Sequence, residues 1–156
     1  MLNCLYLEND ATEIIPNLWL SNCEASLNEK FLKEFNIKHI INVTHEIPNP
    51  FSYVIYLHLP INDDEVKSKN MNSFFDQSTE FIWDNLKMNL PVMVFCKRGH
   101  HRSASIIVAF LIRFFKLDYF DAIKYVVSKR PCSLTRKTNI TTALFNYAVH
   151  RQKINN

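Results

Sequence analysis

The sequence predicts an α/β fold, a single domain with a mostly parallel sheet flanked by helices. Segments with the composition of strands alternate along the chain with segments that carry apolar residues at helical spacing. One strand segment, Val92–Phe95, is wholly apolar, as is typical of strands buried on both faces of a central sheet. The 156 residues are 47% hydrophobic and contain no internal repeat or Pro/Gly/Ser-rich linker, which favours one domain with a sizeable core. We expect residues 1–10 to be a variable N-terminal segment and residues 11–156 to be the folded domain.

The first half of the chain shows strand and helix signals in turn. Residues 13–20 (EIIPNLWL) are expected to form an early strand pair or a turn interrupted by the proline. Residues 24–35 carry two leucines and two phenylalanines at helical spacing and predict one helix. Residues 38–44 (KHIINVT) are rich in β-branched side chains and predict a strand. Residues 53–59 predict a second strand, which the following proline closes.

The second half of the chain is expected to be mainly helical around one buried strand. Residues 74–86 have the spacing of an amphipathic helix. After the strand Val92–Phe95, residues 102–115 are apolar nearly all round, which predicts a buried helix. Two further helices are expected, one over residues 118–129 that stops before a proline and one over residues 137–151.

Charge and cysteine content exclude several classes of protein. The net charge is +3 with scattered lysines and arginines, which suits an anionic substrate but lacks the dense basic stripe of a nucleic-acid-binding protein. The longest apolar run, residues 106–112, is far too short to span a bilayer, and the first residues lack the pattern of a signal peptide. The four cysteines form no C-x-x-C pair and are expected to be reduced thiols. We therefore expect a cytoplasmic protein, or a nuclear one, with no integral membrane segment.

The segment PVMVFCKRGHHRSAS, residues 91–105, carries the most specific chemical signal. The chain has one glycine, where an average usage of about 7% would give about eleven, and that glycine is Gly99. A buried strand ends, Cys96 follows at once and a buried helix begins near Arg102. A short loop before a helix can turn its backbone N–H groups inward and bind an anion, and Gly99 allows backbone angles, or an approach distance, that a Cβ would obstruct. Arg102 adds a planar fork that suits two phosphate oxygens.

These features predict that Cys96 is a nucleophile. The helix N-terminus, the N–H groups and the guanidinium all favour the thiolate, so the pKa of Cys96 should fall well below about 8.5. A thiolate that faces a bound phosphate can attack it in line, and Ser103 could donate a hydrogen bond to the sulfur. The alternatives are a buried core thiol, a solvated basic turn and a Cys/His metal site, the last of which lacks a second ligand pair at zinc spacing. For the two histidines, an incidental place in a solvated turn is an equal alternative. The residues expected to bind phosphate are Lys97, Arg98, Gly99, His100, His101 and Arg102.

A carboxylic acid is also needed, because the leaving oxygen must receive a proton in the transition state. Asp63 and Asp64 are the candidates, in the segment LPINDDE that follows the strand over residues 53–59. The alternative for this pair is a solvated acidic turn. We expect this strand to be a neighbour of Val92–Phe95, which would bring the pair close to the phosphate.

The segment FCKRGHHRSAS resembles the signature loop of the cysteine-dependent dual-specificity protein phosphatases, His-Cys-x5-Arg-Ser. The similarity extends through EIIPNLWLSN, IINVTHEIPNPF, LPINDDE and AIKYVVSKRP, and is strongest to the slingshot branch. It implies a five-stranded mixed sheet flanked by helices, which is the protein tyrosine phosphatase-like fold of the minimal dual-specificity type. It also implies no metal or other cofactor, and a phosphocysteine intermediate. By position it implies Cys96 as nucleophile, Arg102 as phosphate ligand, Ser103 as the residue that assists the sulfur, and Asp63, rather than Asp64, as general acid.

The resemblance implies a phosphatase domain over residues 11–156 whose partner is a phosphorylated protein, dephosphorylated on tyrosine and on serine or threonine. Two alternatives stay open. The basic loop residues suit a phosphoinositide or an RNA 5′-phosphate, and Phe95 stands where the family has histidine, which suits a weakly active phosphate-binding pseudophosphatase. Loss of that histidine is expected to raise the pKa of Cys96 relative to the family and to slow the chemistry. His101 stands where the family usually has a small residue, and is expected to crowd the loop or add a titratable charge.

Overall fold

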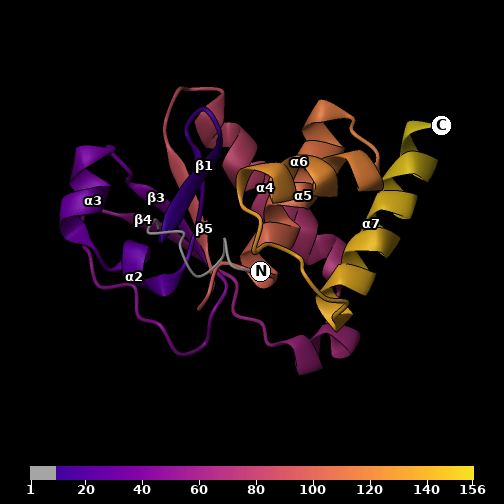
Figure 1. The fold of residues 1–156 in the computed structure, drawn as a ribbon, viewed down its shortest axis with the longest axis horizontal. Coiled ribbons are helices and arrows are strands. Elements are labelled where there is room, and N and C mark those ends of the chain that lie inside the picture. The colour runs from indigo at the N-terminus through magenta and orange to yellow at the C-terminus, as the bar shows by residue number, and fades with distance from the viewer. Residues whose placement is uncertain (1–9) are drawn as a thin grey trace.

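Residues 10–156 are described by a computed structural model, in which a five-stranded mixed sheet lies between two groups of helices (Figure 1). The strand order is β1-β2-β5-β3-β4, and only β1 runs antiparallel to its neighbour. The strands are β1 (Ala11–Ile15), β2 (Leu18–Ser21), β3 (His39–Asn42), β4 (Ile55–His58) and β5 (Val92–Phe95). The predicted α/β class with a mostly parallel sheet is therefore confirmed. The predicted variable segment, residues 1–10, lies outside the described residues except for Asp10.

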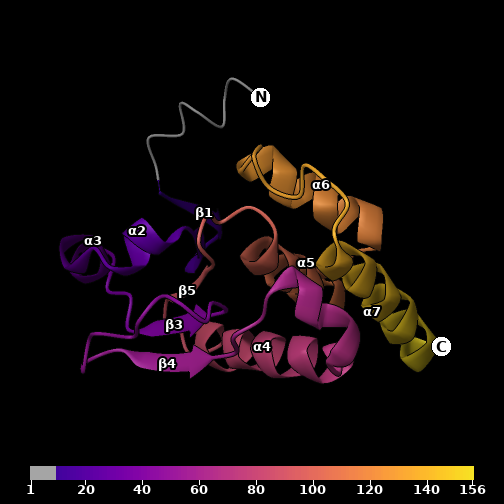
Figure 2. The same ribbon diagram turned by 90° about the horizontal axis from the view of Figure 1, so that it is seen from below.

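Helices cover both faces of the sheet. The helices are α2 (Cys23–Ser26), α3 (Glu29–Glu34), α4 (Met71–Leu86), α5 (Arg102–Phe115), α6 (Tyr119–Lys129) and α7 (Asn139–Asn155), and a 3-10 helix, η1, spans Asp63–Ser68. Helices α2 and α3 lie on one side of the sheet, and α4, α5, α6 and α7 lie on the other (Figures 1 and 2). No helix among the described residues is long and apolar enough to cross a membrane.

The sheet has a hydrophobic core on each face, and the side chains of β5 alternate between these two cores. Val92, Val94 and Cys96 belong to the large cluster under α4 to α7, whereas Met93 and Phe95 belong to the smaller cluster under α2 and α3. This division follows from the two-residue period of a strand, in which successive side chains point to opposite faces. The side chains of Cys96 and Phe95 consequently lie on opposite sides of the sheet.

Four sequence-based expectations differ from the structure. The helix expected over residues 74–86 begins earlier, at Met71, because the Asn70 side chain caps it there. The helix expected over residues 24–35 is two short helices, because the side chain of Asn28 accepts a hydrogen bond from the Phe31 N–H (3.1 Å) and starts a new helix. Strand β4 is at the edge of the sheet, and β3, not β4, is the neighbour of β5. The last helix begins two residues later than expected and continues to Asn155, beyond the expected end at residue 151.

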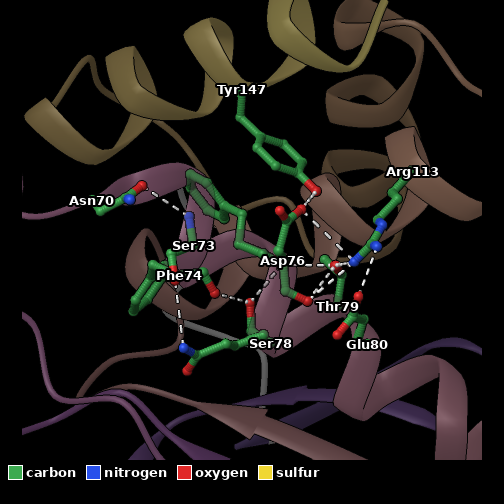
Figure 3. Close-up of polar contacts among 11 residues, drawn as sticks. Asn70, Ser73, Phe74, Asp76, Ser78, Thr79, Glu80, Arg113 and Tyr147 are labelled. Carbon is green, nitrogen blue, oxygen red and sulfur yellow. Dashed lines mark hydrogen bonds and ion pairs between the residues drawn. The ribbon is translucent and has the colours of Figure 1, made fainter. Parts of the chain in front are cut away.

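A polar network fixes α7 against α4 and α5 (Figure 3). The buried Tyr147 hydroxyl donates to Asp76 Oδ1 (2.8 Å), and burial raises the pKa of this phenol. Arg113 from α5 donates to Thr79 Oγ1 (3.1 Å) and to Glu80 Oε1 (2.9 Å) on α4. Because these bonds join the three helices, the N-terminus of α7 is held in one place, next to η1.

Candidate active site

The connection between β5 and α5 places Cys96 at the carboxyl end of a central strand. Cys96 follows β5 directly and is 3% exposed, and α5 begins at Arg102. Cys96 Sγ lies 3.1 Å from Ser103 Oγ and accepts a hydrogen bond from the Gly99 N–H at 3.2 Å. The predicted pairing of this thiol with Ser103 is therefore present in the structure.

The carbonyl groups of residues 97–101 all accept hydrogen bonds from donors outside the loop. The bonds run from Cys23 N to Lys97 O (3.1 Å), from Arg130 Nη2 to Arg98 O (3.5 Å), from Arg130 Nε to Gly99 O (3.0 Å), from Leu134 N to His100 O (2.8 Å) and from Ser105 N to His101 O (2.9 Å). Across a planar trans peptide the C=O and the following N–H point in opposite directions. The N–H groups that follow these carbonyls therefore turn toward the inside of the loop, where they can bind an anion.

Arg130 is the side chain that holds the loop most extensively. It lies at the end of α6, is 3% exposed, and bridges the loop carbonyls of Arg98 and Gly99 to Thr12 Oγ1 on β1 (2.9 Å). A guanidinium can make these bonds at once because its donors are arranged in a rigid fork. The segment AIKYVVSKRP contributes to the family resemblance, but it does not predict this role for Arg130. An arginine directly before the proline that ends a helix is the only local signal for it.

Gly99 has the special backbone angle and the close approach that were expected, but the approach is to a different part of the molecule. Its φ is +71°, and a Cβ would lie 2.7 Å from both the carbonyl carbon and the carbonyl oxygen of Ser21 and 2.9 Å from Arg130 Nη2. A Cβ at residue 99 would therefore clash with the end of β2 and with Arg130, both outside the loop. It would not project into the space where the phosphate would bind. Glycine allows the loop to pack directly on the sheet backbone.

The environment of Cys96 favours the thiolate. Burial is the strongest single influence and acts to raise the pKa of the thiol. The hydrogen bonds from Ser103, the positive charge of Arg102 and the Gly99 N–H together outweigh burial, so the pKa of Cys96 is lowered from its ordinary value. The direction agrees with the sequence-based expectation for this loop.

A cavity of about 710 Å³ opens over Cys96. It is lined by Asn62, Asp63, Cys96, Lys97, Arg98, His100, His101, Arg102, Thr135, Arg136, Lys137, Thr138 and Ile140. Gly99 and Ser103 are buried beneath it, and Asp64 is exposed and outside its lining. The structure thus brings together the predicted loop residues and Asp63. The basic side chains of Arg136 and Lys137, on the loop before α7, were missed because no motif marks them.

Asp63 is held between the cavity and α7. Its Oδ2 accepts from Asn139 N–H (3.1 Å) and its Oδ1 from Ile140 N–H (2.9 Å), the first N–H groups of that helix. These two bonds fix the orientation of the Asp63 carboxyl group. Arg102 reaches the same loop and donates through Nη1 to Ile61 O (2.9 Å). These contacts bring Asp63 to the cavity although β4 is not a neighbour of β5.

The two histidines line the cavity. Burial, followed by the charge of Arg130, lowers the pKa of His100. Burial, followed by the charge of Arg136, lowers the pKa of His101, and the nearby Asp63 carboxylate opposes this shift. Both imidazoles are therefore mainly neutral at pH 7. Among the described residues, His101 Nε2 is buried with no hydrogen-bond partner. Within residues 10–156, no group of three or more His, Cys, Asp or Glu side chains is arranged so that it could hold a metal ion.

Comparisons with known proteins show which family and which individual proteins this chain resembles in sequence and in fold. Residues 18–149 match the family described as dual specificity phosphatase, catalytic domain. A probable dual specificity protein phosphatase of Dictyostelium discoideum is 31% identical over 138 residues, which are 88% of this chain and 63% of the relative. Human dual specificity protein phosphatase 9 is 36% identical over 121 residues, 76% of this chain but 31% of that protein. This chain therefore spans less than two thirds of these relatives. The crystal structure of human DUSP28 shares the fold, with a TM-score of 0.83 at 22% identity over 94% of this chain and 97% of that chain.

Proposed function

This chain belongs to the dual specificity phosphatase family, and on that premise we propose that it hydrolyses phosphotyrosine and phosphoserine or phosphothreonine in proteins. We assign the catalytic domain to residues 11–156. The observation that carries the proposal is the position of Cys96 Sγ, beneath a cavity that also contains Arg102 and Asp63. Inward N–H groups and a cationic fork suit a phosphate, and a sulfur with a lowered pKa suits a nucleophile.

The first chemical step transfers the phosphoryl group to the enzyme. The thiolate of Cys96 attacks phosphorus, an S–P bond forms, and the P–O bond to the substrate breaks. The loop N–H groups and Arg102 bind the equatorial oxygens, where negative charge is distributed. Asp63 gives its proton to the leaving oxygen, which departs as a neutral hydroxyl group of the substrate protein. The bonds from α7 to the Asp63 carboxylate position it at the rim of the cavity.

The second step returns the enzyme to its starting state. Asp63, now a carboxylate, takes a proton from a water molecule as that water attacks phosphorus. The S–P bond breaks, inorganic phosphate leaves, and Cys96 becomes a thiolate again. Ser103 Oγ, 3.1 Å from the sulfur, stabilises the departing thiolate by hydrogen bonding. Lys97, Arg98, His100 and His101 line the cavity in which the phosphate would bind.

The pseudophosphatase alternative rests on Phe95, and the geometry of this residue gives it little support. Phe95 is fully buried in the core under α2 and α3, on the face of the sheet opposite to Cys96. The loop is positioned instead by bonds from Cys23, Arg130 and Leu134. A histidine at residue 95 is therefore not needed to hold the loop in a phosphate-binding shape.

The proposal is tested with an aryl phosphate. We expect turnover by the unmodified protein, loss of turnover in Cys96→Ser, and a reduction in kcat of roughly 100-fold in Asp63→Asn, the size of a typical general-acid contribution. Cys132→Ser, a change at a buried cysteine outside the cavity, and Asp64→Asn serve as matched controls that keep turnover. Turnover by Cys96→Ser equal to that of the unmodified protein would refute the proposal. A panel of phosphopeptides, phosphoinositides and RNA 5′-phosphates then identifies the substrate class, with phosphopeptides expected to be preferred.

A further inference from the structure

A second hollow adjoins the cavity over Cys96. It has a volume of about 380 Å³ and lies between α6, α7 and the loop that joins them. Arg136 and Lys137 line both spaces, so the two lie next to each other along this loop. The remaining wall includes Tyr119, Ile123 and Leu134, together with Phe145 from α7, and we call the space the apolar hollow.

Specific contacts hold the residues that line the apolar hollow in place. The rings of Tyr119 and Phe145 meet edge to face, with centroids 5.1 Å apart and an interplanar angle of 87°. Leu134 adopts φ +56°, a left-handed conformation that is uncommon for a leucine, and its N–H donates to His100 O at 2.8 Å. Because the same residue lines the hollow and bonds the phosphate loop, the position of the hollow relative to Cys96 is fixed.

We propose that the apolar hollow binds a large apolar side chain of the substrate polypeptide, a few residues from the phosphorylated residue. The inference rests on the proposed phosphatase function and names a determinant of its specificity. Arg136 and Lys137 are exposed between the two spaces and carry the charge that complements a phosphorylated chain. A peptide that places its phosphate over Cys96 must pass this pair to leave the cavity on that side, and its next side chains then reach the hollow.

The shape of the hollow favours a polypeptide over the other substrates of the same chemistry. The Tyr119 and Phe145 rings are packed on each other, so they do not form the open parallel platform on which nucleic-acid bases stack. The rest of the apolar wall is aliphatic, from Ile123 and Leu134, as in pockets that receive Leu, Met or Phe side chains. An inositol ring is polar and gains nothing from such a wall.

The test uses phosphotyrosine peptides of otherwise constant sequence, with a single leucine or a single serine at each position within about four residues of the phosphotyrosine. Four extended residues span about 13 Å. We expect one position at which leucine raises kcat/KM roughly tenfold over serine, the effect of burying about two methylene groups. Phe145→Ala should reduce this ratio to about threefold or less, because the hollow then lacks one wall.

Two further variants test whether the leucine preference depends on the lining of the apolar hollow. Phe115→Ala is the matched control, since Phe115 is 52% exposed, comparable to 44% for Phe145, but lines neither space, and it should keep the leucine preference. Thr142→Trp adds bulk at an exposed wall position and should abolish the preference without removing any core contact.

The outcomes separate this inference from the proposed function. Absence of aryl phosphate turnover by the unmodified protein would refute the proposed function itself. Normal turnover with equal rates on all leucine and serine peptides would overturn the apolar hollow alone. Faster turnover of a phosphoinositide or an RNA 5′-phosphate than of every peptide would also overturn it, and a preference that survives both Phe145→Ala and Thr142→Trp would do the same.

Discussion

At the scale of single residues, Gly99 connects the composition of the chain to its site. We expect Gly99→Val to abolish phosphate binding, because a β-branched side chain at φ +71° costs about 1–2 kcal/mol and its Cβ would meet the backbone of Ser21 at 2.7 Å. The loop must then move off β2. The measurement is the inhibition constant of orthovanadate, a phosphate analogue, expected to rise at least about 100-fold.

The control for Gly99→Val is a second valine substitution at a residue with positive φ, in a turn outside the loop. Asn89 has φ +58° and lies in the turn between α4 and β5, at the opposite end of β5 from the loop and outside the cavity lining. Asn89→Val should leave orthovanadate affinity close to normal. Unchanged affinity in Gly99→Val would show that the left-handed glycine does not shape the phosphate loop.

Ser103 is the second residue whose substitution has a defined expected effect, here on the pKa of Cys96. Its hydroxyl lies 3.1 Å from Cys96 Sγ and helps to lower the pKa of that thiol. Below its pKa the thiol is protonated and reacts slowly, so the rate of iodoacetamide alkylation rises with pH through the pKa of Cys96. Removing the hydroxyl in Ser103→Ala should move this midpoint to higher pH, whereas Ser78→Ala, on α4, should not. An unmoved midpoint in Ser103→Ala would contradict the assigned hydrogen bond.

At the scale of elements, the strongest local patterns predicted both type and boundary. Strand β5 and helix α5 have the bounds that the apolar run and the buried helix pattern gave. The split between α2 and α3 was missed because a single Asn28 cap outweighed four apolar residues at helical spacing. The order of strands β3 and β4 was missed because pairing depends on long-range contacts that no local pattern contains.

Arg130 is an element-scale feature, since it ties α6 and β1 to the phosphate loop. Lysine cannot replace the fork that bonds Gly99 O and Thr12 Oγ1 together. We expect Arg130→Lys to lower kcat/KM by tenfold or more and to weaken orthovanadate binding, and to reduce stability by about 1–3 kcal/mol. The first two effects distinguish a positioning residue from a merely structural one.

The matched control for Arg130 is Arg113→Lys. Arg113 joins α5 to α4 through Thr79 and Glu80, away from the cavity (Figure 3). It should lose a comparable amount of stability while kcat/KM stays within about twofold of normal. Both variants are assayed at one temperature below their unfolding transitions. If they lose kcat/KM equally, Arg130 has no special role in positioning the loop between β5 and α5.

At the scale of the whole molecule, the site is an assembly of parts from distant regions of the chain. Cys96 and Arg102 come from the β5–α5 connection, Asp63 from η1 and the basic pair Arg136 and Lys137 from the loop before α7. The sequence predicted Cys96 and Arg102 because they lie in one motif with local chemistry, and it singled out Asp63 over Asp64 only through the family resemblance. The Asp63 contact with α7 and the basic pair could not be predicted, because they depend on where α7 docks.

In the proposed mechanism, Cys96 carries the phosphoryl group during turnover. The direct measurement is rapid acid quenching of the Asp63→Asn variant with p-nitrophenyl phosphate, followed by mass spectrometry of the proteolysed enzyme. The nitrophenolate leaves without needing a proton from Asp63, so this variant still forms the intermediate but hydrolyses it slowly, because Asp63 activates the attacking water. We predict one added phosphoryl group on the peptide that contains Cys96. Phosphate on another residue, or turnover with no phosphorylated enzyme at any quench time, would contradict the mechanism.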